Sequence, residues 1–102
     1  MLFRSVSFLD IMLRDQSGTM RVEDIAVAEG SSWIGKKLKE LGMQGRYDLL
    51  ALAVRRADGE TKFNPREDTL IAKGDVLVVM GEVSSVWEAR EAAGSKIPHR
   101  AV

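Results

Sequence analysis

The sequence contains no cysteine among its 102 residues. The absence of cysteine excludes disulfide bonds, thiolate metal sites and cysteine nucleophiles, and it fits a reducing compartment. An excess of one charge is absent as well, because fifteen basic side chains balance fifteen acidic ones. A net charge of zero provides no overall attraction to nucleic acid or to an anionic membrane, and it favours self-association. We therefore expect no nucleic acid partner.

Long apolar runs are also absent. The longest unbroken run, residues 49–54, is far shorter than the roughly 20 residues that a membrane helix needs. Residues 1–13 are largely apolar, but they contain Arg4 and Asp10 and lack a small-residue cleavage site, which argues against a signal peptide. The sequence therefore predicts a soluble chain.

No set of residues typical of a catalytic site is present. The glycines of residues 30–45 do not form a G-x-G-x-x-G phosphate loop, and there is no Ser-His-Asp or paired-carboxylate arrangement. The acidic pairs Glu23-Asp24 and Glu67-Asp68 could offer oxygen ligands to a hard cation, but their spacing does not resemble a calcium loop, and solvated carboxylates are more common. We expect no enzymatic activity, and the presence and identity of a metal stay unknown.

The periodicity of the apolar residues predicts one small α+β domain with a largely antiparallel sheet. With 45% hydrophobic side chains, the chain can bury a single modest core. Alternation predicts a strand over residues 21–28, and the apolar run at residues 76–80 after Gly74-Asp75 predicts a strand at the sheet centre. Between them, the Asp58-Gly59 pair predicts a β-hairpin with a two-residue loop.

Helical spacing predicts two helices packed on this sheet and a third helix that precedes it. The first packed helix spans residues 31–42, with a serine cap, apolar residues at i, i+4 and i+7, and a final glycine. The second spans residues 82–93. Trp33 and Trp87 occupy positions in these helices where packing in a core or an interface is more common than stacking on a base. The preceding helix is predicted over residues 3–15.

This N-terminal helix carries apolar residues on more than one side. Successive helical residues are turned about 100° apart, so one small domain cannot cover all of them. A second copy of the chain is the most available cover, and two-fold pairing is the commonest closed arrangement. We therefore predict a homodimer whose interface includes Phe3, Val6, Phe8, Leu9, Met12 and Leu13.

The predicted hairpin carries a cluster of residues that could bind an anion. A two-residue loop at Asp58-Gly59 places Arg55 opposite Lys62 on one face of the sheet. Like charges in direct opposition destabilise a sheet, and a bound phosphate would relieve their repulsion. A solvated rim without a ligand is the alternative. The predicted ligand-binding residues are Arg55, Lys62, Phe63, Asn64 and Pro65.

Four short motifs stand in a characteristic order and spacing, namely Ile34-Gly35-Lys36, Arg55-Arg56, Pro65 and Gly74-Asp75. Together they resemble the RCK_C family, also called TrkA-C, which is the C-terminal lobe of cytoplasmic regulators of potassium channels and transporters. The resemblance covers residues 21–93. One departure is Asp48, where the family often has glycine before its central strand. A positive φ at this position would cost more for aspartate than for glycine.

The resemblance implies a fragment with three parts: a linker or crossover helix over residues 1–20, the RCK_C domain over residues 21–93 and a tail over residues 94–102. Residues 8–14 resemble the segment that links a preceding nucleotide-binding lobe to this domain. That lobe and a membrane pore are therefore the implied partners in the parent polypeptide. Such domains are usually dimers that bind an effector near the dimer cleft, either a cyclic dinucleotide such as cyclic di-AMP or a divalent cation.

From this resemblance we expect the ligand-sensing and dimerisation domain of a potassium channel or potassium transporter. The domain would act at the cytoplasmic side of the cell membrane. One alternative is a structural dimerisation lobe without its own ligand. Another is the same domain in a different cation or anion transporter.

Overall fold

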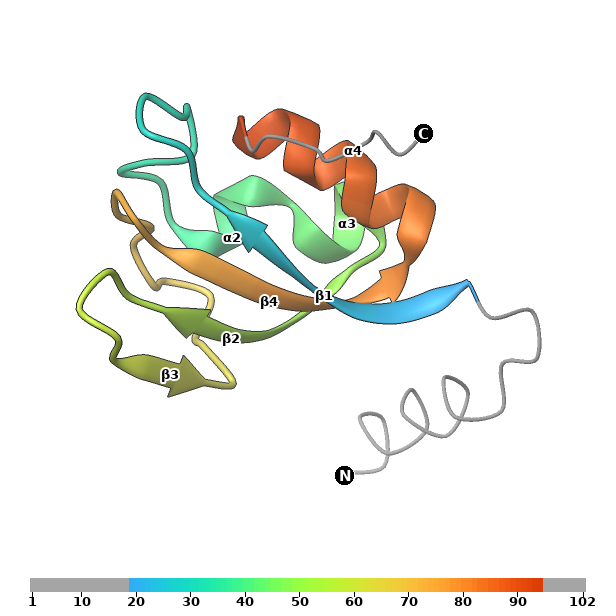
Figure 1. Ribbon diagram of the computed structural model, residues 1–102, viewed down its shortest axis with the longest axis horizontal. Helices are drawn as coiled ribbons and strands as arrows, with labels where there is room; N and C mark the ends of the chain where they lie inside the picture. The colour runs from blue at the N-terminus through green and yellow to red at the C-terminus, as the bar shows by residue number, and fades with distance from the viewer. Residues whose placement is uncertain (1–18, 95–102) are drawn as a thin grey trace.

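The computed structural model describes residues 19–94, in which four strands form one antiparallel sheet and helices cover one of its faces (Figure 1). In chain order the elements are β1 (Met20–Ala26), α2 (Leu38–Leu41), α3 (Met43–Tyr47), β2 (Leu50–Arg55), β3 (Thr61–Phe63), β4 (Val76–Glu82) and α4 (Val83–Ala93). The predicted α+β class with an antiparallel sheet is confirmed. The helix predicted over residues 3–15 and the tail from residue 95 lie outside the described residues.

Strand β4 occupies the centre of the sheet, in which the strand order is β1-β4-β2-β3. It pairs with β1 along its whole length and with β2 on its other side. Leu77, Val79 and Met80 are fully buried, and Met80 lies on the opposite face from the other two. Val76 and Val78, on the same face as Met80, are partly buried. The strand thus buries apolar side chains on both faces, and the prediction of a central strand at residues 76–80 is confirmed.

The main core lies between the sheet and the helices. Ile25 and Val54 both pair with Leu77, so these three side chains point to the helix-covered face. The helices and loops bury Trp33, Leu38, Leu41, Met43, Tyr47, Val86, Ala89 and Ala93 against this face. The rings of Trp33 and Tyr47 lie 6.4 Å apart at 54°, so Trp33 is a core residue as predicted. Trp87 on α4 stays 48% exposed and is not part of the core.

The helix predicted over residues 31–42 is much shorter than expected. Residues 32–35 form a turn, and Ser31 Oγ accepts a hydrogen bond from the Trp33 N–H at 3.0 Å. Residues 35–37 pair with the segment before β4, since the Gly35 N–H donates to the Ile71 carbonyl oxygen at 2.8 Å. These backbone groups thus form hydrogen bonds with a distant segment and not with the next turn of a helix. Gly42 ends α2 in the left-handed conformation, as predicted.

The hairpin between β2 and β3 has a different register from the predicted one. Its loop has three residues, because the Arg56 N–H donates to the Glu60 carbonyl oxygen at 2.7 Å and Gly59 adopts φ 94°. A type I turn followed by a left-handed glycine closes such loops. The register is shifted by one residue, and a one-residue shift moves a side chain to the other face of the sheet. The observed pairs are Ala53 with Phe63, Val54 with Lys62 and Arg55 with Thr61.

Gly81 in β4 fits closely beside the residues that lead into β2. A Cβ atom at this position would lie 2.5 Å from Leu49 Cδ2 and 3.0 Å from the Asp48 carbonyl oxygen. We expect Gly81→Ala to lower the free energy of unfolding by roughly 1–3 kcal/mol, because overpacking forces side chains and backbone to shift. Chemical denaturation of the two proteins measures this difference.

Gly45→Ala in α3 is the matched control, since nothing lies within 4 Å of the added methyl group. The control variant should be as stable as the original protein or slightly more so, because alanine favours a helix over glycine. An equal loss of stability in both variants would contradict the close fit at Gly81.

Candidate functional site

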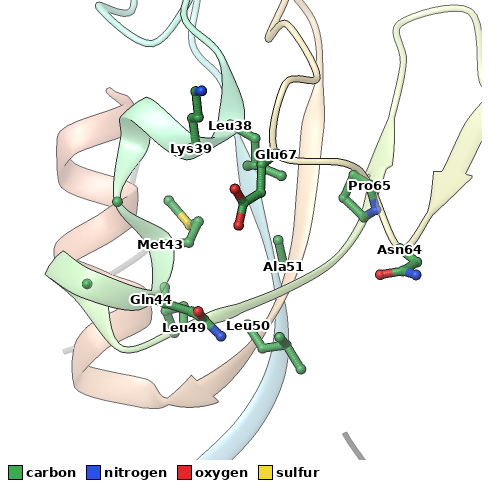
Figure 2. A pocket seen from close by; sticks show the side chains of 12 residues that line it. Leu38, Lys39, Met43, Gln44, Leu49, Leu50, Ala51, Asn64, Pro65 and Glu67 are labelled. Carbon is green, nitrogen blue, oxygen red and sulfur yellow. The ribbon is translucent and has the colours of Figure 1, made fainter. Parts of the chain in front are cut away.

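A pocket of about 430 Å³ lies between helices α2 and α3, strand β2 and the segment after β3 (Figure 2). This volume is within the range usual for small-molecule sites. The apolar side chains that line it are Leu38, Met43, Leu49, Leu50, Ala51 and Pro65. The polar ones are Lys39, Gln44, Asn64 and Glu67, and the backbone of Gly42 and Gly45 completes the wall.

The chain turns toward the pocket at Asn64. This residue has φ 51°, a left-handed conformation that asparagine tolerates better than most residues. Its N–H donates to the carbonyl oxygen of Leu52 at 2.8 Å. Leu52 is the extra residue of a β-bulge in β2, where the pairing with β4 shifts. Bulges bend strands and redirect side chains, and this one accompanies the turn that brings Asn64 and Pro65 to the pocket.

Asp48 provides a similar bend before the start of β2. It has φ 60°, and its N–H donates to the Gln44 carbonyl oxygen at 3.2 Å, which ends α3. The chain then enters the sheet at Leu49. The positive φ considered from the sequence is therefore present at Asp48. Strained backbone positions of this kind cost on the order of 1–3 kcal/mol and occur often at functional sites.

The lining of the pocket combines apolar walls with charges of both signs. Lys39 is the only cation and Glu67 the only anion among the described residues that line it. The Lys39 N–H donates to the Glu67 carbonyl oxygen at 2.9 Å, so α2 and the segment after β3 are joined at this wall. Lys39 and the amides of Asn64 and Gln44 can donate hydrogen bonds to an anionic ligand. The apolar side chains can pack against a ring.

The structure separates the five residues predicted to bind a ligand. Only Asn64 and Pro65 line the pocket. Arg55 and Phe63 lie on the sheet face away from the helices, whereas Lys62 shares the face of the buried Val54. The predicted opposition of Arg55 and Lys62 is therefore wrong, because the three-residue loop shifts the register. Phe63 is 76% exposed.

The helix side of the pocket was not predicted from the sequence. Lys39, Met43 and Gln44 lie far from Asn64 in the chain, and no local pattern connects them. They come together because the Leu38 N–H donates to the Thr69 carbonyl oxygen at 2.8 Å and ties α2 to the segment before β4. The only sequence signal near them is the Ile34-Gly35-Lys36 motif.

The acidic pairs considered for a cation do not form a metal site in the described part of the chain. Among residues 19–94, no group of three or more His, Asp or Glu side chains is placed to hold a metal ion. Glu23 Oε1 instead accepts a hydrogen bond from Arg90 Nη2 at 3.3 Å. Within the same residues, every helix is too short or too polar to cross a membrane.

The chain is similar to a curated potassium transport protein and to solved regulatory domains. It is 34% identical over 61 residues to the K(+)/H(+) antiporter subunit KhtT of Bacillus subtilis (strain 168), covering 60% of this chain and 37% of KhtT. The RCK_C domain dimer of S. agalactiae BusR in complex with c-di-AMP matches with TM-score 0.62 and 22% identity, covering 74% of this chain and 91% of that one. The RCK C domain of the potassium transport protein KtrA in complex with c-di-AMP matches with TM-score 0.65 and 20% identity, covering 85% and 96%.

These structural similarities show the fold, and the family follows from the sequence. The model of the TrkA-C domain matches residues 22–94, which is nearly all of the described chain. The match contains the motifs at residues 34–36, 55–56, 65 and 74–75, so the resemblance drawn from them is confirmed. The chain belongs to the TrkA-C domain family.

Proposed function

We propose that residues 21–93 form a cytoplasmic regulatory domain of a potassium channel or potassium transporter. Membership of the TrkA-C family and the similarity to an antiporter subunit support this function. The chain spans only 37% of the length of KhtT. A nucleotide-binding lobe and a membrane pore in the parent polypeptide therefore remain part of the proposal, as does its place at the cytoplasmic side of the membrane.

The observation that carries the proposal is the pocket between α2, α3 and β2. Its apolar side chains suit a purine ring, and Lys39, Gln44 and Asn64 offer donors to phosphate and ring acceptors. Two similar domains have been solved with c-di-AMP. We infer that the effector is a cyclic dinucleotide. The described residues offer no support for a divalent cation.

The two-fold symmetry of such a ligand favours binding by a homodimer. A cyclic dinucleotide with two identical halves presents the same chemical groups to each protomer of a two-fold dimer. Each pocket can then take one half of the ligand. The separation of Arg55 from Lys62 favours one of the two alternatives, a structural dimerisation lobe without its own ligand, because the paired cations that suggested an anion site are not adjacent. The other alternative, the same domain in a different cation or anion transporter, is unaffected by it.

Calorimetric titration of the full chain with c-di-AMP tests the effector. We expect saturable heat and a higher melting temperature with ligand, since binding to the folded state stabilises it by mass action. Asn64→Gly should weaken binding without lowering the melting temperature of the free protein. Glycine keeps the left-handed backbone at this position but removes the side-chain amide.

Lys39→Gln should also weaken binding and reduce its dependence on salt, because it removes the only cation among the described pocket residues. Lys36→Gln is the matched control, as Lys36 is exposed and does not line the pocket. The absence of heat at millimolar c-di-AMP would leave the structural lobe as the better interpretation. Binding that is lost in Arg55→Ala and kept in Lys39→Gln would move the site to the open sheet face.

Sedimentation equilibrium tests the predicted homodimer. We expect a dimer at tens of micromolar protein, and we expect Phe8→Asp combined with Met12→Asp to dissociate it, because charges at a buried apolar contact are costly. Both residues lie outside the described part of the chain. A monomer of the unchanged protein at that concentration would reject the prediction.

A dimer that survives these two substitutions would place the interface on the domain itself. Phe63 on the open sheet face and Trp87 on α4 are then the residues to replace by alanine, since they are 76% and 48% exposed. Large exposed aromatic side chains are common in protein interfaces.

A further inference from the structure

An ion pair between the partly exposed Arg56 and the buried Asp75 joins the hairpin to the turn before β4. Arg56 Nη1 donates to Asp75 Oδ2 at 2.5 Å, and Asp75 is 1% exposed. The same nitrogen donates to the Leu70 carbonyl oxygen at 3.0 Å. Arg56 therefore holds two points of the connector, which we define as residues 64–75.

Asp75 accepts two further hydrogen bonds, and one of its carboxylate oxygens has no partner. Its Oδ2 also accepts the Ala72 N–H at 2.8 Å, and its carbonyl oxygen accepts the Val27 N–H at 2.9 Å. Its Oδ1 is buried without a hydrogen-bond partner. An unsatisfied buried oxygen costs stability. The buried Asp75 carboxylate therefore depends on Arg56 as its ion-pair partner.

The hairpin loop also contacts the turn that contains Asp75. A Cβ atom at Gly74 would lie 2.8 Å from Ala57 Cβ, so the backbone of the turn contacts the loop closely. Gly74 has φ 85°, which favours glycine at this position as well. The hairpin loop and the turn directly before β4 are thus in direct contact.

The connector held by Arg56 is also one wall of the pocket. Asn64, Pro65 and Glu67 line the pocket, and the Glu67 and Thr69 carbonyl oxygens accept the N–H groups of α2. A ligand that restrains this wall therefore restrains the connector. Leu70 follows directly, and its carbonyl oxygen is bound by Arg56. A continuous chain of contacts leads from the pocket to Asp75.

We propose that Arg56 couples the effector pocket to the turn before β4 and to Val27 after β1, as a positioning residue and not as a ligand residue. The identity of the effector rests on the proposed function. Restraint of the connector passes through Arg56 to Asp75, and from Asp75 to β4 and to Val27 at the end of β1. Val27 directly follows β1, so this route ends beside the strand that pairs with β4 along its whole length.

Backbone hydrogen exchange in the full chain tests the coupling without ligand. Arg56→Gln removes the ion pair and keeps a polar side chain. Exchange at the Leu38, Ala72 and Val27 amides should become about tenfold faster or more. The substitution removes the charged hydrogen bond from Arg56 to Asp75, and these three amides donate to Asp75 or to the connector. Amides in the centre of the β1–β4 ladder should keep their rates.

Arg66→Gln is the matched control, because Arg66 is an exposed residue of the same connector. Its Nε lies 3.7 Å from Asp68 Oδ1. This variant should leave all of these rates unchanged. Uniform acceleration across the sheet by Arg56→Gln would overturn the proposal, because it would show a general loss of stability. Acceleration confined to the hairpin loop would overturn it as well.

A second arm uses c-di-AMP as the probe. In the unchanged protein, ligand should slow exchange at Val27. In Arg56→Gln, c-di-AMP should still bind with an affinity within about tenfold, but the effect on Val27 should be lost. Slowing of Val27 that persists in the variant would overturn the proposal. If c-di-AMP does not bind the unchanged protein, the proposed effector is wrong, and the experiment without ligand still decides whether Arg56 couples the two regions.

Discussion

The backbone pairing of strand β4 is the interaction on which the rest of the structure depends. It forms hydrogen bonds to β1 on one side and to β2 on the other, so all sheet contacts between the first and the middle part of the described chain pass through it. Its side chains Leu77 and Val79 face the helices. Helix α4 follows it without a loop, so the strand also sets where this helix starts. Burial of such apolar side chains stabilises the fold by roughly 1.5–3 kcal/mol each.

The entry to β4 is secured by polar contacts, in contrast to its apolar interior. Asp75 stands directly before the strand, is almost fully buried and accepts hydrogen bonds from Arg56 and from the Ala72 N–H. Removing Arg56 would leave the buried Asp75 carboxylate without its ion-pair partner, which costs stability. The turn is therefore held in one arrangement as long as the hairpin loop stays in place. This dependence links two segments that are distant in the sequence.

The pocket depends on backbone bends more than on any single side chain. Asn64 and Asp48 both adopt left-handed conformations at the two ends of the hairpin, and Gly42 does so between α2 and α3. The pocket lies beside these bends, between the two short helices and β2. The lining of this space combines polar donors and acceptors with an apolar wall, which suits the binding of a small ligand.

The sequence by itself determined the family, the fold class, the central strand and the stop at Gly42. These features depend on local patterns: apolar alternation, an apolar run after a Gly-Asp turn, and motifs at characteristic spacing. The hairpin was located correctly as well, but its register was not, because Asp58-Gly59 is compatible with loops of two or three residues. One residue of difference placed Arg55 and Lys62 on opposite faces of the sheet.

Only the tertiary structure decided the helix side of the pocket and the ion pair of Arg56 with the buried Asp75. Residues 35–37 are not helical because their backbone groups form hydrogen bonds with the segment before β4. No local sequence pattern reveals this pairing. The same docking brings Lys39 beside Glu67. Asn64 and Pro65 were predicted from the hairpin and do line the pocket, while Arg55, Lys62 and Phe63 do not. Local sequence patterns predict helices, strands and turns, but they do not show which distant segments come into contact. Those contacts are decided when the elements pack together.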